Sequence, residues 1–393
     1  MSLFKQNYRD VRRGMTIVEL LVVLGVLSIL LGIAATAVKT GTRGKKQREA
    51  ARQVNAYIAA AQAKAVQVNR PVGIEIARNL TDVDGDNVYT SGTDTGIGNA
   101  SLLMYTIETP PPYAGDDVSA RIGISVPVGY GPGSTVTLTD TTPFFYAAAA
   151  NLMNAGDLVG VKLNYRGTIY SATVIDNAPL QIQFQIPAYD RTIFDLGTVP
   201  CQIFLPPVRT SATPLQLPSD MCIDLTCSGV ANTGNEFANW AAGTNDLSIR
   251  FLFSPRGNVQ SVNYNGLWLA PTGNIHMLVG KYDQAVDALE VMGTDGINEV
   301  ATFPPGTPVN YVNYLTPSDP DLDTNLADAT AMWVSVNFLT GQITTTRNKL
   351  IQDSFLTDTA FTALSQAAKN QAILAEARDF ARRVLIVKGQ GDN

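Results

Sequence analysis

The feature that most constrains this chain is an apolar run close to its N-terminus. From Leu20 to Val38 the sequence contains no ionisable side chain, and Glu19 and Lys39 flank the run. A helix needs roughly 20 apolar residues to cross the hydrocarbon core of a bilayer, and the run has about this length. We therefore expect residues 15–38 to form a membrane-spanning helix.

Basic residues before the run predict its orientation. Residues 1–14 are net positive because they contain, against the single acid Asp10, the residues Lys5, Arg9, Arg12 and Arg13. Positively charged flanks stay on the cytoplasmic side of a membrane. The chain after Lys39 is therefore expected on the outer side.

Glu19 is the single ionisable side chain within residues 15–38. A carboxylate in an apolar segment costs roughly 2.5–3.5 kcal/mol on insertion scales, so it normally has a partner and a function. A cut between Gly14 and Met15 would create an α-amino group close in sequence to this carboxylate. In a stacked assembly, the positive N-terminus of one subunit can then neutralise Glu19 of its neighbour.

The string GMTIVEL at residues 14–20 resembles the prepilin cleavage and methylation motif of type IV pilins and type II secretion pseudopilins. The resemblance implies that prepilin peptidase cleaves after Gly14 and that Met15 becomes the N-methylated first residue. The family commonly has Phe at this first position, and Met is an accepted variant. Glu19 would then be the assembly residue that pairs with a neighbouring subunit.

Two alternatives explain an N-terminal apolar run without this processing. The first is an ordinary secretory signal peptide, for which Ala35-Thr36-Ala37 offers a small-x-small cleavage site. The second is a plain signal anchor that is never cleaved. Against the signal peptide, the run is longer than a usual hydrophobic region and begins with Glu19.

A helical pattern continues beyond the apolar run, over residues 39–70. Apolar residues recur at spacings of three and four and form one stripe, namely Ala51, Val54, Ile58, Ala61, Ala65 and Val68. Pro71 is expected to end the helix, and Gly41 and Gly44 allow a bend or local melting between its halves. We expect this amphipathic half to pack against a sheet.

A basic cluster lies at the start of this amphipathic half. Its members are Lys39, Arg43, Lys45, Lys46, Arg48 and Arg52. The cluster predicts contact with lipid headgroups or with complementary charge on neighbouring subunits. A solvated helix face explains it equally well.

The rest of the chain reads as a β-rich domain. Charged residues make up only 16%, whereas Gly (32) and Pro (21) are plentiful, which is typical of a turn-rich β protein. Val72, Ile74 and Ile76 alternate with Gly73 and Glu75 and predict a half-buried first strand at 71–76. Similar alternation predicts β hairpins within 247–350, with a turn at Pro255-Arg256-Gly257 and another at Thr340-Gly341. Residues 77–246 between the strand and these hairpins are too many for a structureless loop, so we expect an inserted β-rich region.

The end of the helix and the first strand, at residues 59–74, resemble the H-type minor pseudopilins of the GspH/FimT family. The strand, Ser254-Pro255-Arg256-Gly257 turn and following strand resemble the same family. The large insertion departs from it, as does an amphipathic helix and tail expected at 351–393. The predicted fold is therefore α+β and pilin-like, with a long N-terminal helix on an antiparallel β domain, an inserted β subdomain and a C-terminal helix.

Two acidic segments are candidate metal sites. Asp82, Asp84 and Asp86 alternate as at the start of a calcium loop. An EF-hand is excluded because Asn87 and Thr93 stand where that loop needs Gly and Glu. Two interpretations of this segment remain: a looser Ca²⁺-binding loop and a plain polar turn. The same two readings apply to the equally spaced Asp319, Asp321 and Asp323.

Signals for catalysis and for nucleic-acid binding are weak. The chain has no Gly-x-Ser-x-Gly elbow, no P-loop, no His-Glu-x-x-His and a single histidine, His276, expected in a strand. A net charge of −6 disfavours nucleic acid, because phosphate repels it. A small basic patch or solvated face remains near the C-terminus, comprising Arg378, Arg382, Arg383 and Lys388.

The three cysteines leave two readings open. Cys222 and Cys227 are close enough in sequence to form a disulfide that closes a small loop in an oxidising compartment. Cys201 would then have no disulfide partner. The alternative is three buried or free thiols.

Together these observations predict a non-enzymatic minor pilin or pseudopilin without a cofactor, unless Asp82, Asp84 and Asp86 bind Ca²⁺. Its expected partners are prepilin peptidase, other pilins or pseudopilins in a filament, and the bacterial inner membrane. It would cross that membrane once, with its C-terminal domain in the periplasm, and serve a type II secretion pseudopilus or a type IV pilus. The alternative is a pilin-anchored surface-binding module for DNA uptake, a polysaccharide or an exported substrate.

Overall fold

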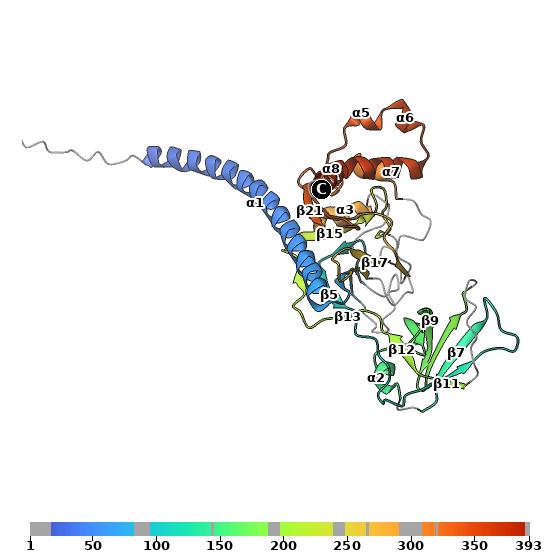
Figure 1. Ribbon diagram of the computed structural model, residues 1–393. Helices are drawn as coiled ribbons and strands as arrows, with labels where there is room; N and C mark the ends of the chain where they lie inside the picture. Colours follow the sequence, from blue (N-terminus) through green and yellow to red (C-terminus); the bar gives the residue numbers. More distant parts are fainter. Residues whose placement is uncertain are drawn as a thin grey trace, which may run out of the picture.

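The fold is seen in a computed structural model of the chain (Figure 1). It describes residues 17–81, 95–142, 145–187, 197–238, 248–264, 267–290, 309–317, 319 and 321–389. Within the first helix, the side chains of Glu19 and of residues 31–43 also lie outside this description.

One long helix, α1 (Ile17–Val68), dominates the N-terminal region. It curves smoothly away from the folded body (Figure 1) and runs unbroken through Gly41 and Gly44, so the local melting considered there does not occur. The helix ends before Pro71, because Asn69 adopts the left-handed conformation (φ 52°) that commonly terminates helices.

Two antiparallel sheets form the body beside α1. The first sheet contains, in spatial order, β13 (Val208–Arg209), β5 (Leu103–Glu108), β1 (Val72–Ala77), β16 (Ile249–Phe253), β17 (Val259–Tyr264) and β18 (Leu267–Leu269), with β14 (Leu215–Gln216) also paired to β5. The second contains β21 (Ile343–Arg347), β20 (Met332–Val336), β19 (Ile275–Lys281), β15 (Met221–Val230) and β4 (Ala100–Ser101). A separate hairpin pairs β2 (Asn79–Thr81) with β3 (Thr95–Ile97).

The C-terminal half of α1 closes a core shared by both sheets. Val72, Ile74 and Ile76 alternate along β1 and are fully buried, as the period of two requires for a strand with one face on the core. They pack with the apolar stripe of α1 and with residues of the second sheet such as Met277 and Val334. Each such aliphatic side chain contributes about 1.5–3 kcal/mol on burial.

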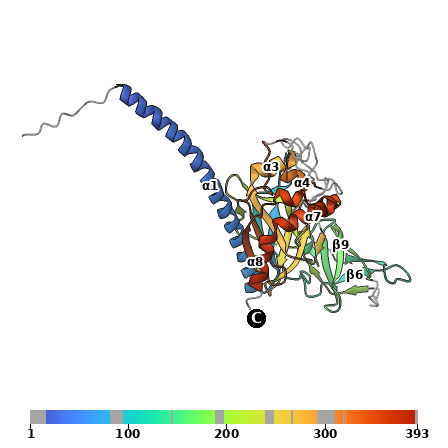
Figure 2. The same ribbon diagram turned by 90° about the horizontal axis from the view of Figure 1, so that it is seen from above.

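Short helices cover the other face of the second sheet. They are α3 (Tyr282–Glu290), α4 (Tyr311–Leu315), α5 (Asp353–Leu356), α6 (Thr359–Thr362), α7 (Gln366–Ala377) and α8 (Asp379–Gly389). Figure 2 shows α3, α4, α7 and α8 gathered on one side of the body. The single helix expected at 351–393 is therefore wrong: this segment is divided into four helices, and the last break falls at Arg378.

A third sheet forms a separate barrel at residues 113–205. Its strands, in spatial order, are β11 (Gly197–Val199), β6 (Ile122–Ser125), β7 (Thr135–Asp140), β10 (Leu180–Gln185), β9 (Tyr170–Asn177), β8 (Leu158–Leu163) and β12 (Cys201–Phe204). Only Pro200 separates β11 from β12, although they pair at opposite edges of the sheet. The sheet must therefore curve until its two edge strands meet at Pro200. The short helix α2 (Ala147–Ala150) adds to its own hydrophobic core.

The region expected as one insertion, residues 77–246, contributes to all three sheets. Strands β5 and β15 from this region belong to the first and second sheets. Only residues 113–205 form the barrel, which stands apart from α1 (Figure 1). Two proline-rich linkers, residues 109–112 and 206–207, connect it to the body.

Candidate functional site: the N-terminal helix and its seat

The projecting half of α1, residues 17–30, presents large apolar side chains all round its surface. Ile17 is 81% exposed, Leu21 65% and Ile29 66%. A helix that is apolar all round is normally buried, either in a large core or in a membrane. No other described part of this chain covers residues 17–30, and an exposed apolar surface of this size is typical of a membrane or protein contact.

The predicted processing residues lie at or beyond the edge of the described part. Gly14 and Met15 are outside it, and Glu19 is placed only by its backbone, in the first turn of α1. The pairing of Glu19 with a neighbour's amine therefore stays a prediction.

The predicted membrane span, residues 15–38, also lies partly outside the description, since it includes side chains from the 31–43 segment. Within the residues that are described, no helix is both long enough and apolar enough to cross a membrane.

The seated half of α1, residues 44–68, is held on the two sheets by a stripe of small and branched side chains. The stripe is 0–2% exposed and consists of Ala50, Ala51, Val54, Ile58, Ala61 and Ala65. Polar contacts fix the helix along the stripe: Thr330 Oγ1 donates to Gln47 Oε1 at 2.5 Å, and Asn55 Nδ2 donates to Thr345 Oγ1 at 2.9 Å. The helical periodicity predicted most of this stripe.

Two hairpin turns meet at the end of this seat, beside Gln62. Its Nε2 donates to the carbonyl of Gly257 at 2.8 Å. Gly341, in the turn of the β20–β21 hairpin, lies so close that a Cβ on it would be 1.8 Å from the same carbonyl oxygen. Gly257 (φ 87°) and Gly341 (φ 70°) both adopt positive φ, which favours glycine. The sequence predicted both turns but not that they meet at Gln62. The only sequence signal for Gln62 is its position next to the apolar stripe.

Surface ion pairs add to the attachment of α1. Lys46 Nζ lies 3.1 Å from Asp220 Oδ2, and Lys64 Nζ lies 3.0 Å from Glu108 Oε2. Exposed pairs of this kind contribute about 0–1 kcal/mol each. Lys46 therefore contacts its own body, whereas Lys45, Arg48 and Arg52 of the predicted basic cluster are exposed.

A buried carboxylate, Glu75 on β1, ties the first sheet together on the face away from α1. It is 1% exposed and accepts hydrogen bonds from Arg209 Nε and Arg250 Nε, each at 3.0 Å. Burial alone would raise the pKa of Glu75, but the hydrogen bond from Arg209 and the charges of Arg250 and Arg209 outweigh it and lower the pKa. Strands β13 and β16 are thereby pinned to β1. Alternation placed Glu75 on the polar side of its strand, but gave no sign of its partners.

The acidic segments do not form a metal site in the described part of the chain. Asp82, Asp84 and Asp86 lie outside it, so the Ca²⁺ prediction for them stays a prediction. Asp319 and Asp321 make a local turn, in which Asp321 N donates to Asp319 Oδ1 at 2.9 Å. No three His, Cys, Asp or Glu side chains among the described residues are placed to hold a metal ion.

The cysteines are free and buried, so the disulfide considered for Cys222 and Cys227 is not formed. Burial raises the pKa of both thiols well above the ordinary value. His276 lies in β19, with its Nδ1 2.7 Å from Ser335 Oγ, and its Nε2 has no hydrogen-bond partner among the described residues. Burial lowers its pKa, so the ring is neutral at pH 7.

Of the basic residues predicted near the C-terminus, Arg378 is not on the surface, whereas Arg382 and Arg383 are exposed. Arg378 is fully buried and donates to the carbonyls of Cys227, Ala231 and Gly234. Burial lowers its pKa to about 10. Asp379 pairs with Arg382 and Arg383. The side chain of Lys388 is outside the described part.

Comparison with known proteins supports the motif at the N-terminus. Residues 9–35 match the family described as the prokaryotic N-terminal methylation motif. This match includes the predicted cleavage position and most of the apolar run, and it indicates a type IV pilin-like substrate of prepilin peptidase. Neither the curated proteins nor the solved structures gave a significant match to the chain.

Proposed function

We propose that this protein is a non-enzymatic minor pilin or pseudopilin, a structural subunit of a type II secretion pseudopilus or a type IV pilus. The observation that carries the proposal is α1 itself. Its projecting half is apolar all round and exposed, its seated half is fixed in the body, and the methylation motif overlaps its start.

The proposed pathway begins in the bacterial inner membrane. Prepilin peptidase cleaves after Gly14, and Met15 becomes the methylated N-terminus. The projecting half of α1 holds the subunit in the bilayer, with the body in the periplasm. Leaving lipid for a bundle of neighbouring helices exchanges one apolar surrounding for another, so packing and polar pairs decide the outcome. The pair between Glu19 and a neighbour's Met15 amine then sets the stacking register.

The rigid attachment of α1 suits this role. A filament subunit must carry its body along when its helix is stacked, and the stripe, the Gln62 junction and the ion pairs fix the two together. Strand β1 after the helix and the β16–β17 hairpin with its Pro255 turn support likeness to H-type minor pseudopilins. In this proposal the barrel is an insertion into that fold.

N-terminal mass spectrometry of the protein purified from its native membrane tests the proposal. We expect a mature chain that begins with N-methylated Met15. A Gly14→Val variant should retain residues 1–14, because a branched side chain replaces the residue next to the scissile bond. A wild-type chain that keeps residues 1–14, or one that starts at Val38, would contradict the proposal.

A second candidate function is a pilin-anchored binding module. The barrel favours it, because it has its own hydrophobic core, contributes nothing to the seat of α1 and is held out on two linkers.

A further inference from the structure

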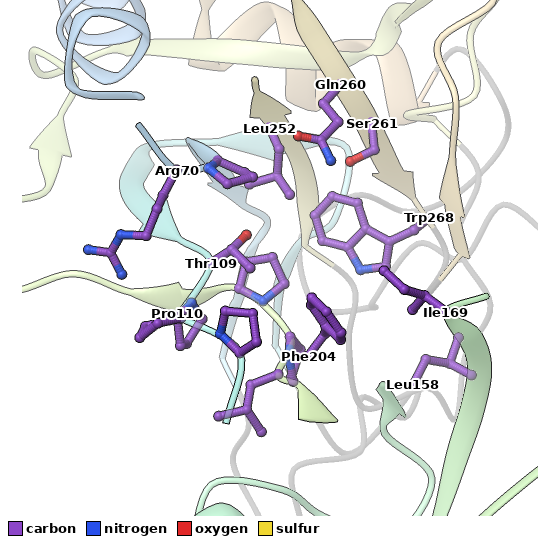
Figure 3. A pocket seen from close by; sticks show the side chains of 16 residues that line it. Arg70, Thr109, Pro110, Leu158, Ile169, Phe204, Leu252, Gln260, Ser261 and Trp268 are labelled. Carbon is purple, nitrogen blue, oxygen red and sulfur yellow. The ribbon is translucent and has the colours of Figure 1, made fainter. Parts of the chain in front are cut away.

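A cavity of about 470 Å³ lies where the barrel meets the body. It is lined by the turn after α1, by both linkers, by β8, β12 and the segment before β9 in the barrel, and by β16, β17 and β18 of the first sheet (Figure 3). Cavities of this size commonly hold small ligands when an apolar lining is combined with a few polar groups. The cavity takes no part in the seat of α1, so the filament role does not account for it.

Prolines form much of the wall. They are Pro71, Pro110, Pro111, Pro112, Pro206 and Pro207. The two linkers run together into the barrel, where the backbones of Tyr113 and Ile203 exchange hydrogen bonds at 2.8 and 2.7 Å. A proline has no N–H, so the proline residues of these segments offer apolar rings and carbonyl acceptors but no backbone donors. An extended peptide could not form a β ladder along them, because a ladder needs donors from both strands.

Exposed apolar side chains complete the floor of the cavity. The indole of Trp268 is half-buried and lies across the opening from Pro110 and Phe204 (Figure 3). Leu158 is 42% exposed and Ile169 is 51% exposed. Water therefore covers aliphatic and aromatic surface here that a ligand could cover at a gain of roughly 25 cal/mol per Å².

Polar side chains border this apolar surface on two sides. Gln260 and Ser261 of β17 lie next to Trp268, and Arg70 lies on the opposite side of the cavity (Figure 3). Among the described lining residues there is no carboxylate to balance a cationic ligand. A purely apolar ligand would cover Gln260 and Ser261 without replacing their hydrogen bonds to water, which is unfavourable.

We propose that this cavity binds a short neutral glycan of one or two pyranose units. A pyranose ring has apolar C–H faces, which fit against the indole of Trp268 and the proline rings. Its equatorial hydroxyls both donate and accept, so they can pair with Gln260, Ser261 and the linker carbonyls. The cavity would give the barrel a recognition role that is separate from filament assembly.

The test uses the full-length protein in lipid nanodiscs, because detergent tails could fill an apolar hollow and maltoside detergents are themselves glycans. Maltose, cellobiose, lactose and N,N′-diacetylchitobiose are titrated separately and followed by calorimetry and saturation-transfer NMR. We expect at least one of them to bind with a Kd of about 1 mM or tighter. Trp268→Ala should weaken that binding about tenfold or more, and Gln260→Ala several-fold.

Tyr165→Ala is the matched control, because Tyr165 is a 47% exposed aromatic residue of the barrel that does not line the cavity. It should leave the affinity unchanged. Near-UV circular dichroism of each variant distinguishes a lost site from a lost fold.

Three results would overturn the proposal. One is the absence of binding for all four sugars up to about 10 mM. Another is unchanged binding in folded Trp268→Ala and Gln260→Ala variants. The third is selective binding of a proline-rich peptide, Ac-PPWPP-NH₂, in place of every sugar. None of these results bears on cleavage after Gly14, so the filament proposal is tested independently.

Discussion

The two halves of α1 belong to one unbroken helix but differ in how their apolar side chains are distributed and covered. In the seated half, apolar residues form one stripe and polar residues face solvent, so the body of the same chain satisfies it. In the projecting half, apolar residues occupy every face and remain exposed. The difference teaches that folding and assembly are separable in this protein: one half stabilises the body, and the other needs lipid or another subunit.

The largest expected effect on stability comes from truncating one side chain in the seated half. Ile58 is fully buried, so Ile58→Ala should lower the free energy of unfolding of the body by about 2–5 kcal/mol through lost burial and a cavity. The matched variant is Leu24→Ala, because Leu24 is 54% exposed in the projecting half. It should change the unfolding free energy by less than about 0.5 kcal/mol.

Urea unfolding of both variants in lipid nanodiscs measures this contrast. Equal losses of stability in Ile58→Ala and Leu24→Ala would show that the two halves are not separable.

A second variant tests the junction at which the hairpin turns hold α1. Gly341→Ala combines a positive φ with a Cβ that would collide with the Gly257 carbonyl, and it should cost about 2–3 kcal/mol. Gly129→Ala is the control, since Gly129 also has a positive φ (74°) but no atom lies within 4 Å of the added Cβ. It should cost about 1 kcal/mol. Thermal unfolding that shows equal losses would remove the argument for a tight junction.

A third variant contrasts the buried carboxylate of the body with that of the projecting half. The partners of Glu75 lie within the chain, whereas the partner proposed for Glu19 is the Met15 amine of another subunit. Because the pKa of Glu75 is lowered in the folded state, its contribution is fully present above its unfolded pKa of about 4.3 and is lost as the pH falls through the lower folded value.

Glu75→Gln should therefore cost about 2 kcal/mol at pH 7, and should flatten the decline in stability below about pH 4.3. Arg209 is half exposed, so part of its interaction is screened by solvent. Urea midpoints between pH 3 and pH 7 measure both effects. A variant with the same acid sensitivity as the wild type would show that Glu75 does not govern it.

Local patterns predicted what depends on local physics. The spacing of Ala51, Val54 and Ile58 predicted the stripe of α1, and glycine and proline predicted the turns of the two hairpins. What could not be predicted depends on partners that are distant in sequence. The barrel closes because β11 and β12, which are separated by Pro200 alone, pair at opposite edges of one sheet, with β6 and with β8.

Arg378 is a second case in which the partners are distant in sequence and could not be predicted from it. A helical pattern places it on a polar face, as one residue of a continuous helix. Its partners are carbonyls of residues 227–234, which the fold brings to it from about 150 positions away. A sequence pattern cannot distinguish an exposed arginine from one that donates to distant carbonyls, so the surface position predicted for Arg378 and the unbroken helix were both wrong.

The most direct test of the central claim is the distribution of Glu19→Ala protein between membrane and filament in cells. The account predicts that it is still cleaved after Gly14 and held in the inner membrane, but is depleted about tenfold from sheared filaments, because a neighbour's amine has lost its partner. Recovery in filaments at the wild-type level, with cleavage intact, would contradict the claim that Glu19 directs assembly.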